Sequence, residues 1–134
     1  MERKVVIACD HAGNEVKDAI IQDLRAKGYT VTDFGCDGTV SVNYPDYAHL
    51  VCGTGIGMSM AANKHRGIRA ALCENPFSAE MTRRHNDANV ICLGARVLPV
   101  ETAVSLANIF LETPYEGGRH DARVAMRNAL DDNG

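Results

Sequence analysis

The chain has 134 residues, is 46% hydrophobic and carries a formal net charge of -3. This size fits one globular domain, residues 1–134, with a modest core. No basic N-terminal segment precedes a long apolar run, and no stretch approaches the about 20 apolar residues of a membrane span, so we expect a cytoplasmic protein that is neither exported nor embedded in a membrane. A pI near 5.9 gives no global attraction for nucleic acid, although a local cluster such as Arg83, Arg84 and His85 can still bind a phosphate.

Cysteine and histidine usage argues against disulfides and metal sites. The five cysteines are odd in number, lack C-x-x-C spacing and lie in three cases in apolar runs, so we expect mostly small core residues. The five histidines are scattered, without an H-x-x-x-H pair or a tight cluster with cysteine or carboxylate, so we expect no bound metal. These residues are Cys9, Cys36, Cys52, Cys73 and Cys92, and His11, His49, His65, His85 and His120.

The first 34 residues predict a strand, a helix and a second strand. Residues 4–9 form a short apolar run rich in β-branched side chains, as a buried strand does. Apolar residues three or four apart over 14–27, followed by Gly28, predict a helix with a glycine stop. Residues 29–34 predict another strand, and a connection of this length favours parallel pairing.

The same alternation continues to the end of the chain. Strands are predicted at 67–73 and 89–93, and helices at 58–64, from Pro76 onwards, at 99–112 and at 121–130. Asn75 is a good N-cap for the helix that Pro76 begins. Alternating strands and helices predict a three-layer α/β/α sandwich with a parallel flavodoxin-like or Rossmann-like sheet, strand order 2-1-3-4-5, and a C-terminal helix.

In such a sheet, ligands bind at the carboxyl ends of the strands where the winding reverses, between strands one and three. Asp10 and His11 follow the first strand, and the loop Cys52–Gly57 follows the presumed third strand. Two polar loops that are distant in sequence are therefore expected to flank one crevice.

The loop of Cys52, Gly53, Thr54, Gly55, Ile56 and Gly57 carries the clearest chemical signal. Its glycines let the backbone approach a ligand, and its amides can hold an anion and favour an ionised thiol, which makes Cys52 a candidate base or nucleophile. A glycine-rich turn beside a buried cysteine explains the spacing equally well. A phosphatase-type cysteine loop is excluded because Met58 stands where an arginine is needed, and the match to a dinucleotide-binding loop is weak.

His85 and Asn86 follow a helix and precede a strand, so they are expected at the opposite, amino end of the sheet, where a dimer partner can use them. A lone histidine at a helix end is more often structural. Arg119 and Arg123, four residues apart at the start of a helix, can grip a phosphate or simply form a solvated basic face.

Seven motifs in register closely resemble the ribose-5-phosphate isomerase B and galactose-6-phosphate isomerase family. They are CDHAG from Cys9, YPDYA from Tyr44, CGTGIGMSMAANK from Cys52, GIRAAL from Gly67, HNDANV from His85, GAR from Gly94 and YEGGRH from Tyr115. The match covers nearly the whole chain in order.

The resemblance implies a cofactor-free aldose-ketose isomerase that works through an enediolate. Cys52 moves a proton between C1 and C2, the loop amides from Gly53 to Gly57 stabilise the oxyanion, Thr54 assists proton transfer and His85 opens the sugar ring. Some relatives use a glutamate after the loop, where this chain has Met58. The substrate ligands that the resemblance implies are Asp10, Tyr44 and Asn86 for hydroxyls and His11, Arg96, Arg119 and Arg123 for phosphate, with some supplied by a second subunit of a homodimer or homotetramer.

The segment before Cys52 departs from the family pattern. The family carries roughly 15 more residues there, which complete a helix and the third strand, as a parallel crossover needs. Here only His49, Leu50 and Val51 follow YPDYA, so the third strand is expected to begin abruptly. We favour a missing or engineered segment over a natural deletion. A true deletion predicts exposed apolar surface and a displaced Tyr44. A six-carbon sugar phosphate, or a non-catalytic sugar-phosphate binding module, stays open as an alternative.

Overall fold

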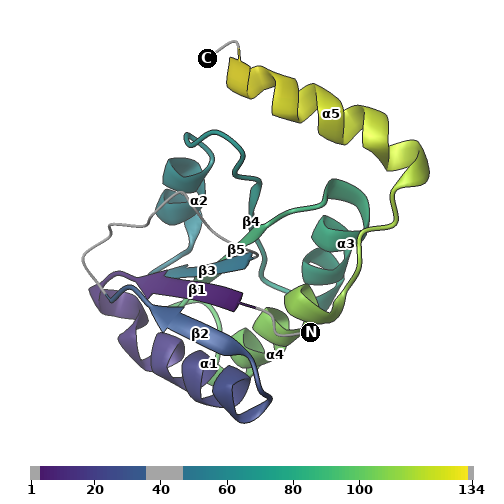
Figure 1. Ribbon diagram of the computed structural model, residues 1–134. Coiled ribbons are helices and arrows are strands. Elements are labelled where there is room, and N and C mark those ends of the chain that lie inside the picture. The colour runs from purple at the N-terminus through teal and green to yellow at the C-terminus, as the bar shows by residue number, and fades with distance from the viewer. Residues whose placement is uncertain (1–3, 36–46, 133–134) are drawn as a thin grey trace.

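The computed structural model describes residues 4–35 and 47–132. Within these ranges one sheet of five parallel strands runs through the molecule in the order β2-β1-β3-β5-β4 (Figure 1). The strands are β1 (Lys4–Cys9), β2 (Thr30–Asp33), β3 (Tyr47–Cys52), β4 (Ala70–Leu72) and β5 (Val90–Gly94). The helices are α1 (Asn14–Ala26), α2 (Ile56–Ala62), α3 (Pro76–Asn86), α4 (Val100–Glu112) and α5 (Asp121–Ala129), with short 3-10 helices at His11–Gly13, Gly118–His120 and Leu130–Asp132.

The predicted parallel α/β class is confirmed, but the predicted order of the last two strands is wrong. β5, not β4, pairs with β3, and β4 forms the edge. The five residues of β5 are all buried, whereas the three residues of β4 are only half-buried, so the more apolar strand takes the interior position. The right-handed crossovers then place α2 and α3 on opposite faces, because the chain moves outward from β3 to β4 and back to β5.

Two apolar clusters of unequal size cover the two faces of the sheet. α1 and α4 lie on one face with the larger cluster, which includes Phe110, and α2 lies on the other, where Met58 and Ala62 cover small strand residues (Figure 1). α5 lies outside the sheet, and its Asn128 accepts a hydrogen bond of 3.3 Å from Arg69, which precedes β4 (Figure 1). Over residues 4–35 and 47–132, none of the helices combines the length and the apolar character needed to cross a bilayer.

Local sequence signals predict the positions of most helices and strands correctly. The Asn75 side chain accepts a hydrogen bond of 2.9 Å from the amide of Ser78, with Pro76 at the first position of α3, as predicted. β3 is longer than expected, because Tyr47 and Ala48 join the strand and pair in register with Val5 and Val6 of β1. The third strand is therefore built partly from the YPDYA motif, whose Tyr44 lies outside the described residues.

His49 of β3 is a histidine inside the larger core. It is fully buried, its ring meets Phe110 edge to face at 5.8 Å, and its Nε2 lies 3.3 Å from the carbonyl oxygen of Ala107. Burial lowers the pKa of His49 to about 4, and the Ala107 contact opposes that shift. The ring is therefore neutral in the folded protein at neutral pH.

The lowered pKa of His49 makes stability depend on pH. The unfolded chain binds a proton at His49 near pH 6.5 and the folded chain does so near pH 4, so stability is lost as the pH falls through this window. We expect the free energy of unfolding to fall by about 2 kcal/mol from this residue between pH 7 and pH 5. Urea unfolding at the two pH values measures it. His49→Leu should remove this slope and His65→Gln, at an exposed histidine, should keep it; equal slopes in all three proteins would contradict the assignment.

Candidate active site

The Cys52 thiol lies at the carboxyl end of β3, in a turn that holds it tightly. Cys52 is buried, and the amide of Gly55 donates a hydrogen bond of 3.1 Å to its sulfur. Gly55 has a φ of +84°, and a Cβ there would lie 2.5 Å from a methyl carbon of Leu72, so only glycine fits. The turn therefore fixes the position of the Cys52 sulfur and aims an amide donor at it.

The end of β5 supports this turn from the side. The amides of Ala95 and Arg96 donate to the carbonyl oxygens of Cys52 and Gly53 at 2.7 and 2.9 Å. The aliphatic part of the Arg96 side chain passes over Gly53, where a Cβ would lie 3.5 Å from its Cδ. The exposed Arg96 guanidinium is thereby held beside the Cys52 turn, so the structure brings these two predicted site residues together.

Thr54 and Gly57 are held less closely. Thr54 is exposed, and its Oγ1 accepts a hydrogen bond of 3.3 Å from the amide of Ile56. Gly57 is exposed in α2, and among the described residues a Cβ there would meet no atom within 4 Å. Thr54 is thus free to face a ligand, whereas nothing in the packing of the described chain requires glycine at position 57.

Asp10 and His11 follow β1 next to the Cys52 turn, as the parallel topology predicts. The amide of Asp10 donates to the carbonyl oxygen of Val51 at 3.0 Å, and its Oδ1 accepts from the amide of Ala12 at 3.0 Å. Asp10 is half-buried and His11 is exposed. The first group of site residues therefore lines the carboxyl ends of β1, β3 and β5.

A second group of predicted site residues lies away from these carboxyl ends. His85 and Asn86 are the last residues of α3, which starts beyond the carboxyl end of β4 and ends before the amino end of β5. Arg119 and Arg123 lie at the start of the C-terminal helical segment, exposed. One chain therefore does not bring the second group to Cys52.

His85 sits in a cluster that the sequence did not suggest. Its ring stacks on that of His120 at 4.2 Å with 17° between the planes. Glu116 lies beside both, with carboxylate oxygens 3.9 Å from His85 Nε2 and 3.7 Å from His120 Nε2. The expectation that no histidines cluster with a carboxylate is wrong for these three, because a turn of the chain brings together residues that are more than 30 positions apart. The i, i+4 spacing of Glu116 and His120 was the available signal.

Arg83 fixes the turn that follows His85 and is not available for a phosphate. It is buried and donates to the Asp87 carboxylate at 2.9 Å, to the Ala88 carbonyl at 2.6 Å and to the Tyr47 hydroxyl at 3.1 Å. Asp87 takes a left-handed φ of 50°, which ends α3. The suggestion that Arg83 belongs to a phosphate-binding cluster is therefore wrong, and its role is to position the His85 turn.

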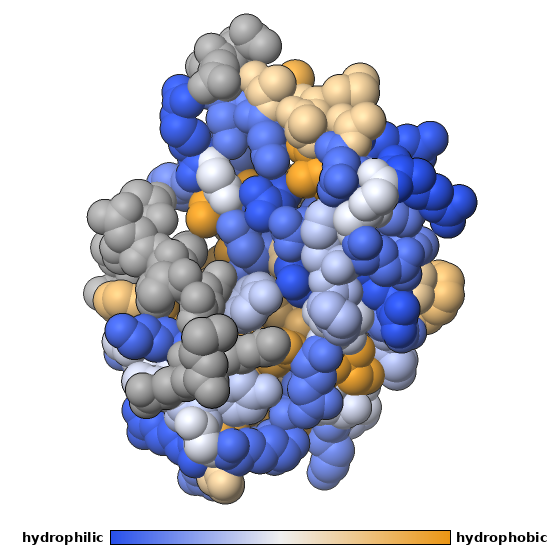
Figure 2. All heavy atoms as spheres, turned by 45° about the vertical axis from the view of Figure 1, so that its right-hand side comes forward, coloured by the Kyte–Doolittle hydropathy of each residue, from blue (hydrophilic) through white to orange (hydrophobic). Residues whose placement is uncertain are grey.

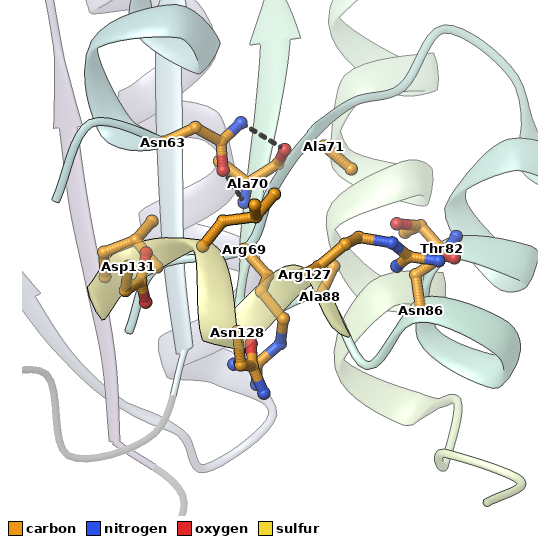
Figure 3. Close-up of a pocket in the computed structure, with 12 residues that line it drawn as sticks. Asn63, Arg69, Ala70, Ala71, Thr82, Asn86, Ala88, Arg127, Asn128 and Asp131 are labelled. Carbon is orange, nitrogen blue, oxygen red and sulfur yellow. Dashed lines mark hydrogen bonds between the residues drawn. The ribbon is translucent and has the colours of Figure 1, made fainter. Parts of the chain in front are cut away.

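A pocket of about 490 Å³ lies between α5, the free edge of β4 and the end of α3 (Figure 3). Of the predicted ligands within residues 4–35 and 47–132, Asn86 alone lines it. Arg127 extends from α5 toward Thr82 and Asn86, and Arg69 donates to the Asp87 carbonyl at 2.8 Å. The pocket therefore lies beside Asn86 of the second group of predicted site residues, and Cys52 is not among the residues that line it.

Comparison with known proteins gives consistent matches along the chain. A family model described as Ribose/Galactose Isomerase matches residues 5–51 and 50–126. Ribose-5-phosphate isomerase B of Escherichia coli (strain K12) is 39% identical over 144 aligned residues, covering 96% of this chain and 97% of that protein. The alignment is longer than the 134 residues of this chain, so it contains positions at which this chain has a gap.

Solved structures with the same fold are equally similar. Ribose-5-phosphate isomerase B of Clostridium thermocellum has a TM-score of 0.89 at 39% identity, covering 97% of this chain and 98% of that one. The Mycoplasma genitalium protein of the same name, with bound ribulose-5-phosphate, has a TM-score of 0.90 at 31% identity, covering 100% of this chain and 99% of that one.

The packing of Gly94 against the Cys52 turn gives a testable consequence. A Cβ on Gly94 would lie 2.7 Å from the carbonyl oxygen of Thr54, so Gly94→Ala must displace the turn and is expected to cost about 1–3 kcal/mol. Gly57→Ala is the matched control, expected to be neutral or to stabilise α2 by up to about 1 kcal/mol. Urea unfolding of both variants measures the difference, and a neutral Gly94→Ala would show that the turn is not held by β5.

Proposed function

The chain belongs to the ribose/galactose isomerase family, and on that basis we propose that it interconverts ribose 5-phosphate and ribulose 5-phosphate in the cytoplasm. The observation that carries the proposal is the buried Cys52 sulfur in its glycine turn, with the Gly55 amide at 3.1 Å. The four cysteines in the described part of the chain are free thiols, which fits a reducing compartment.

The reaction needs only proton movements. With the sugar ring open, the Cys52 thiolate removes the proton from C2 of the aldose, and the electron pair forms an enediolate. The same proton returns to C1, which yields the ketose, while the hydroxyl proton moves from O2 to O1 with Thr54 as the relay. The amides of Gly53 to Gly57 stabilise the oxyanion, and no cofactor enters the balance.

Ring opening and substrate binding use the remaining residues. His85 takes the proton of the anomeric hydroxyl and returns a proton to the ring oxygen, which opens the furanose. The proposed ligands are Asp10, Tyr44 and Asn86 for the sugar hydroxyls and His11, Arg96, Arg119 and Arg123 for the phosphate. Arginine suits the phosphate because its planar guanidinium donates two parallel hydrogen bonds.

The proposed site needs two subunits. The eleven residues of α3 rise by about 16 Å, so His85 cannot reach a sugar held at Cys52 of its own chain. A symmetric pair of chains can place the second group of one chain against the Cys52 turn of the other, twice. Exposed apolar side chains support such an interface: Met60 of α2 is 64% exposed, Met126 of α5 is 70% exposed, and Figure 2 shows an apolar patch over α5. The smallest active assembly is thus a homodimer, which a homotetramer also contains.

Replacing the proposed base tests catalysis against binding alone. We expect Cys52→Ser to lower kcat for ribose 5-phosphate at least about a thousandfold, with Kd by calorimetry changed less than about fivefold, because the hydroxyl keeps the size of the thiol but is not ionised at neutral pH. Wild-type protein in chelator provides the reference rate. Binding without turnover in both proteins would instead indicate a non-catalytic binding module, and a higher kcat/KM for galactose 6-phosphate or allose 6-phosphate would move the substrate to a six-carbon sugar.

Subunit mixing tests the shared site. Cys52→Ser and His85→Asn chains are each expected to be inactive on the cyclic sugar. In a random mixture half of the dimers are mixed, and each mixed dimer has one intact site of two, so about one quarter of the wild-type activity should return. The measurement is the rate after the two chains are refolded together, with each variant refolded alone as the control. Failure to recover activity, with mixed dimers present by mass spectrometry, would place the whole site within one chain.

A further inference from the structure

We propose that His85, Glu116 and His120 form a binding site for a divalent transition-metal ion, zinc above all, and that an ion bound there inhibits the protein. The inhibitory part rests on the proposed function, because it uses the ring-opening role of His85. The ion-binding part rests only on the geometry of the three side chains.

The three side chains offer converging donors. One ligand atom from each lies within 4.8 Å of the others, and the stacked rings present both Nε2 atoms to the same carboxylate. Tetrahedral zinc holds ligands at about 2.0–2.2 Å, which places donors about 3.3–3.5 Å apart. Small side-chain rotations, of the exposed Glu116 above all, are enough to close that gap. Two imidazoles and one carboxylate with an open fourth position are a zinc donor set, whereas magnesium and calcium require oxygen ligands.

His120 provides independent support, because its Nε2 is buried and has no hydrogen-bond partner among the described residues. The side chain is 14% exposed, and the nearest carboxylate oxygen, on Glu116, is 3.7 Å away, too far for a hydrogen bond. Buried polar atoms without partners are rare because desolvation costs free energy that no contact returns. A metal ion between His120 and Glu116 would satisfy this nitrogen.

The segment that carries two of the ligands is already ordered. The Glu116 amide donates to the Arg84 carbonyl at 3.0 Å, and the Tyr115 hydroxyl donates to the Asp121 carboxylate at 2.7 Å. Both contacts fix the chain around Glu116 against α3 and α5, so ion binding orders little new backbone.

Arg84 is the local competitor for the carboxylate. Its Nη1 lies 3.4 Å from Glu116, while its Nε lies 3.0 Å from Glu80. Arg84 can therefore keep Glu80 as a partner when Glu116 turns to the ion. The competition gives a variant that acts in the opposite direction: Arg84→Gln removes a positive charge and frees Glu116, so it should tighten ion binding.

A bound ion would affect activity because it occupies a ring nitrogen of His85. The proposed ring opening needs a free imidazole on His85, and a metal ion occupies its lone pair. Ion binding should therefore slow turnover of the cyclic sugar, and chelator should restore it.

The test measures binding first and activity second. Cobalt replaces zinc as a coloured probe, and titration of chelator-treated full-length protein should give a visible absorption band that saturates at one ion per chain. His120→Asn should weaken binding more than about tenfold, Arg84→Gln should tighten it, and His65→Asn, at an exposed histidine, should leave it unchanged. Cys52→Ser should also bind cobalt without change, which separates this cluster from the thiol.

In the variants that keep Cys52, the zinc concentration that halves turnover should follow the same order as cobalt affinity. Absent binding in the wild type, or binding that His120→Asn leaves intact, would overturn the site. Binding that does not affect turnover would overturn the inhibition alone. A protein with no turnover on any sugar phosphate but with saturable, His120-dependent binding would defeat the proposed function and leave the metal site standing.

Discussion

The direction of α3 relative to its strands is the constraint on which the site depends. α3 begins beyond the carboxyl end of β4 and must reach the amino end of β5, because these neighbouring strands are parallel. The last turn of α3, which contains His85, therefore lies near the amino ends of the strands, whereas Cys52 lies at the carboxyl end of β3. The proposed chemistry, which uses both residues, therefore calls for two chains, and the symmetry of the proposed homodimer would supply two such sites at once.

The Arg83 contacts make this arrangement rigid. The buried guanidinium joins the end of α3, the start of β3 through Tyr47 and, by a bond of 3.2 Å to Thr113, the end of α4. Removing one partner of a buried charge costs about 3–5 kcal/mol, so these elements hold together. The turn that follows His85 is thus tied to β3, the strand whose other end carries Cys52.

Local features were predictable from the sequence, and long-range ones were not. The N-cap at Asn75 and the apolar run at 4–9 specify their elements through contacts within a few residues, and the structure follows them. The position of β5 in the sheet depends on whether β4 or β5 is more deeply buried. The spacing of residues in the sequence does not show which strand that is. The His85, Glu116 and His120 cluster depends on a loop that folds back on α3, so scattered sequence positions concealed it.

The register of β3 decides which of its side chains enter the larger core. The strand alternates, so Tyr47, His49 and Val51 face the larger core while Ala48 and Leu50 face α2. A slip of one residue would send the Tyr47 ring to the α2 face and break its contact with Arg83. Keeping Tyr47 in place forces His49 into the core, where burial lowers its pKa to about 4. The buried histidine is therefore a consequence of the register, and the Ala107 carbonyl and the Phe110 ring offset part of its cost.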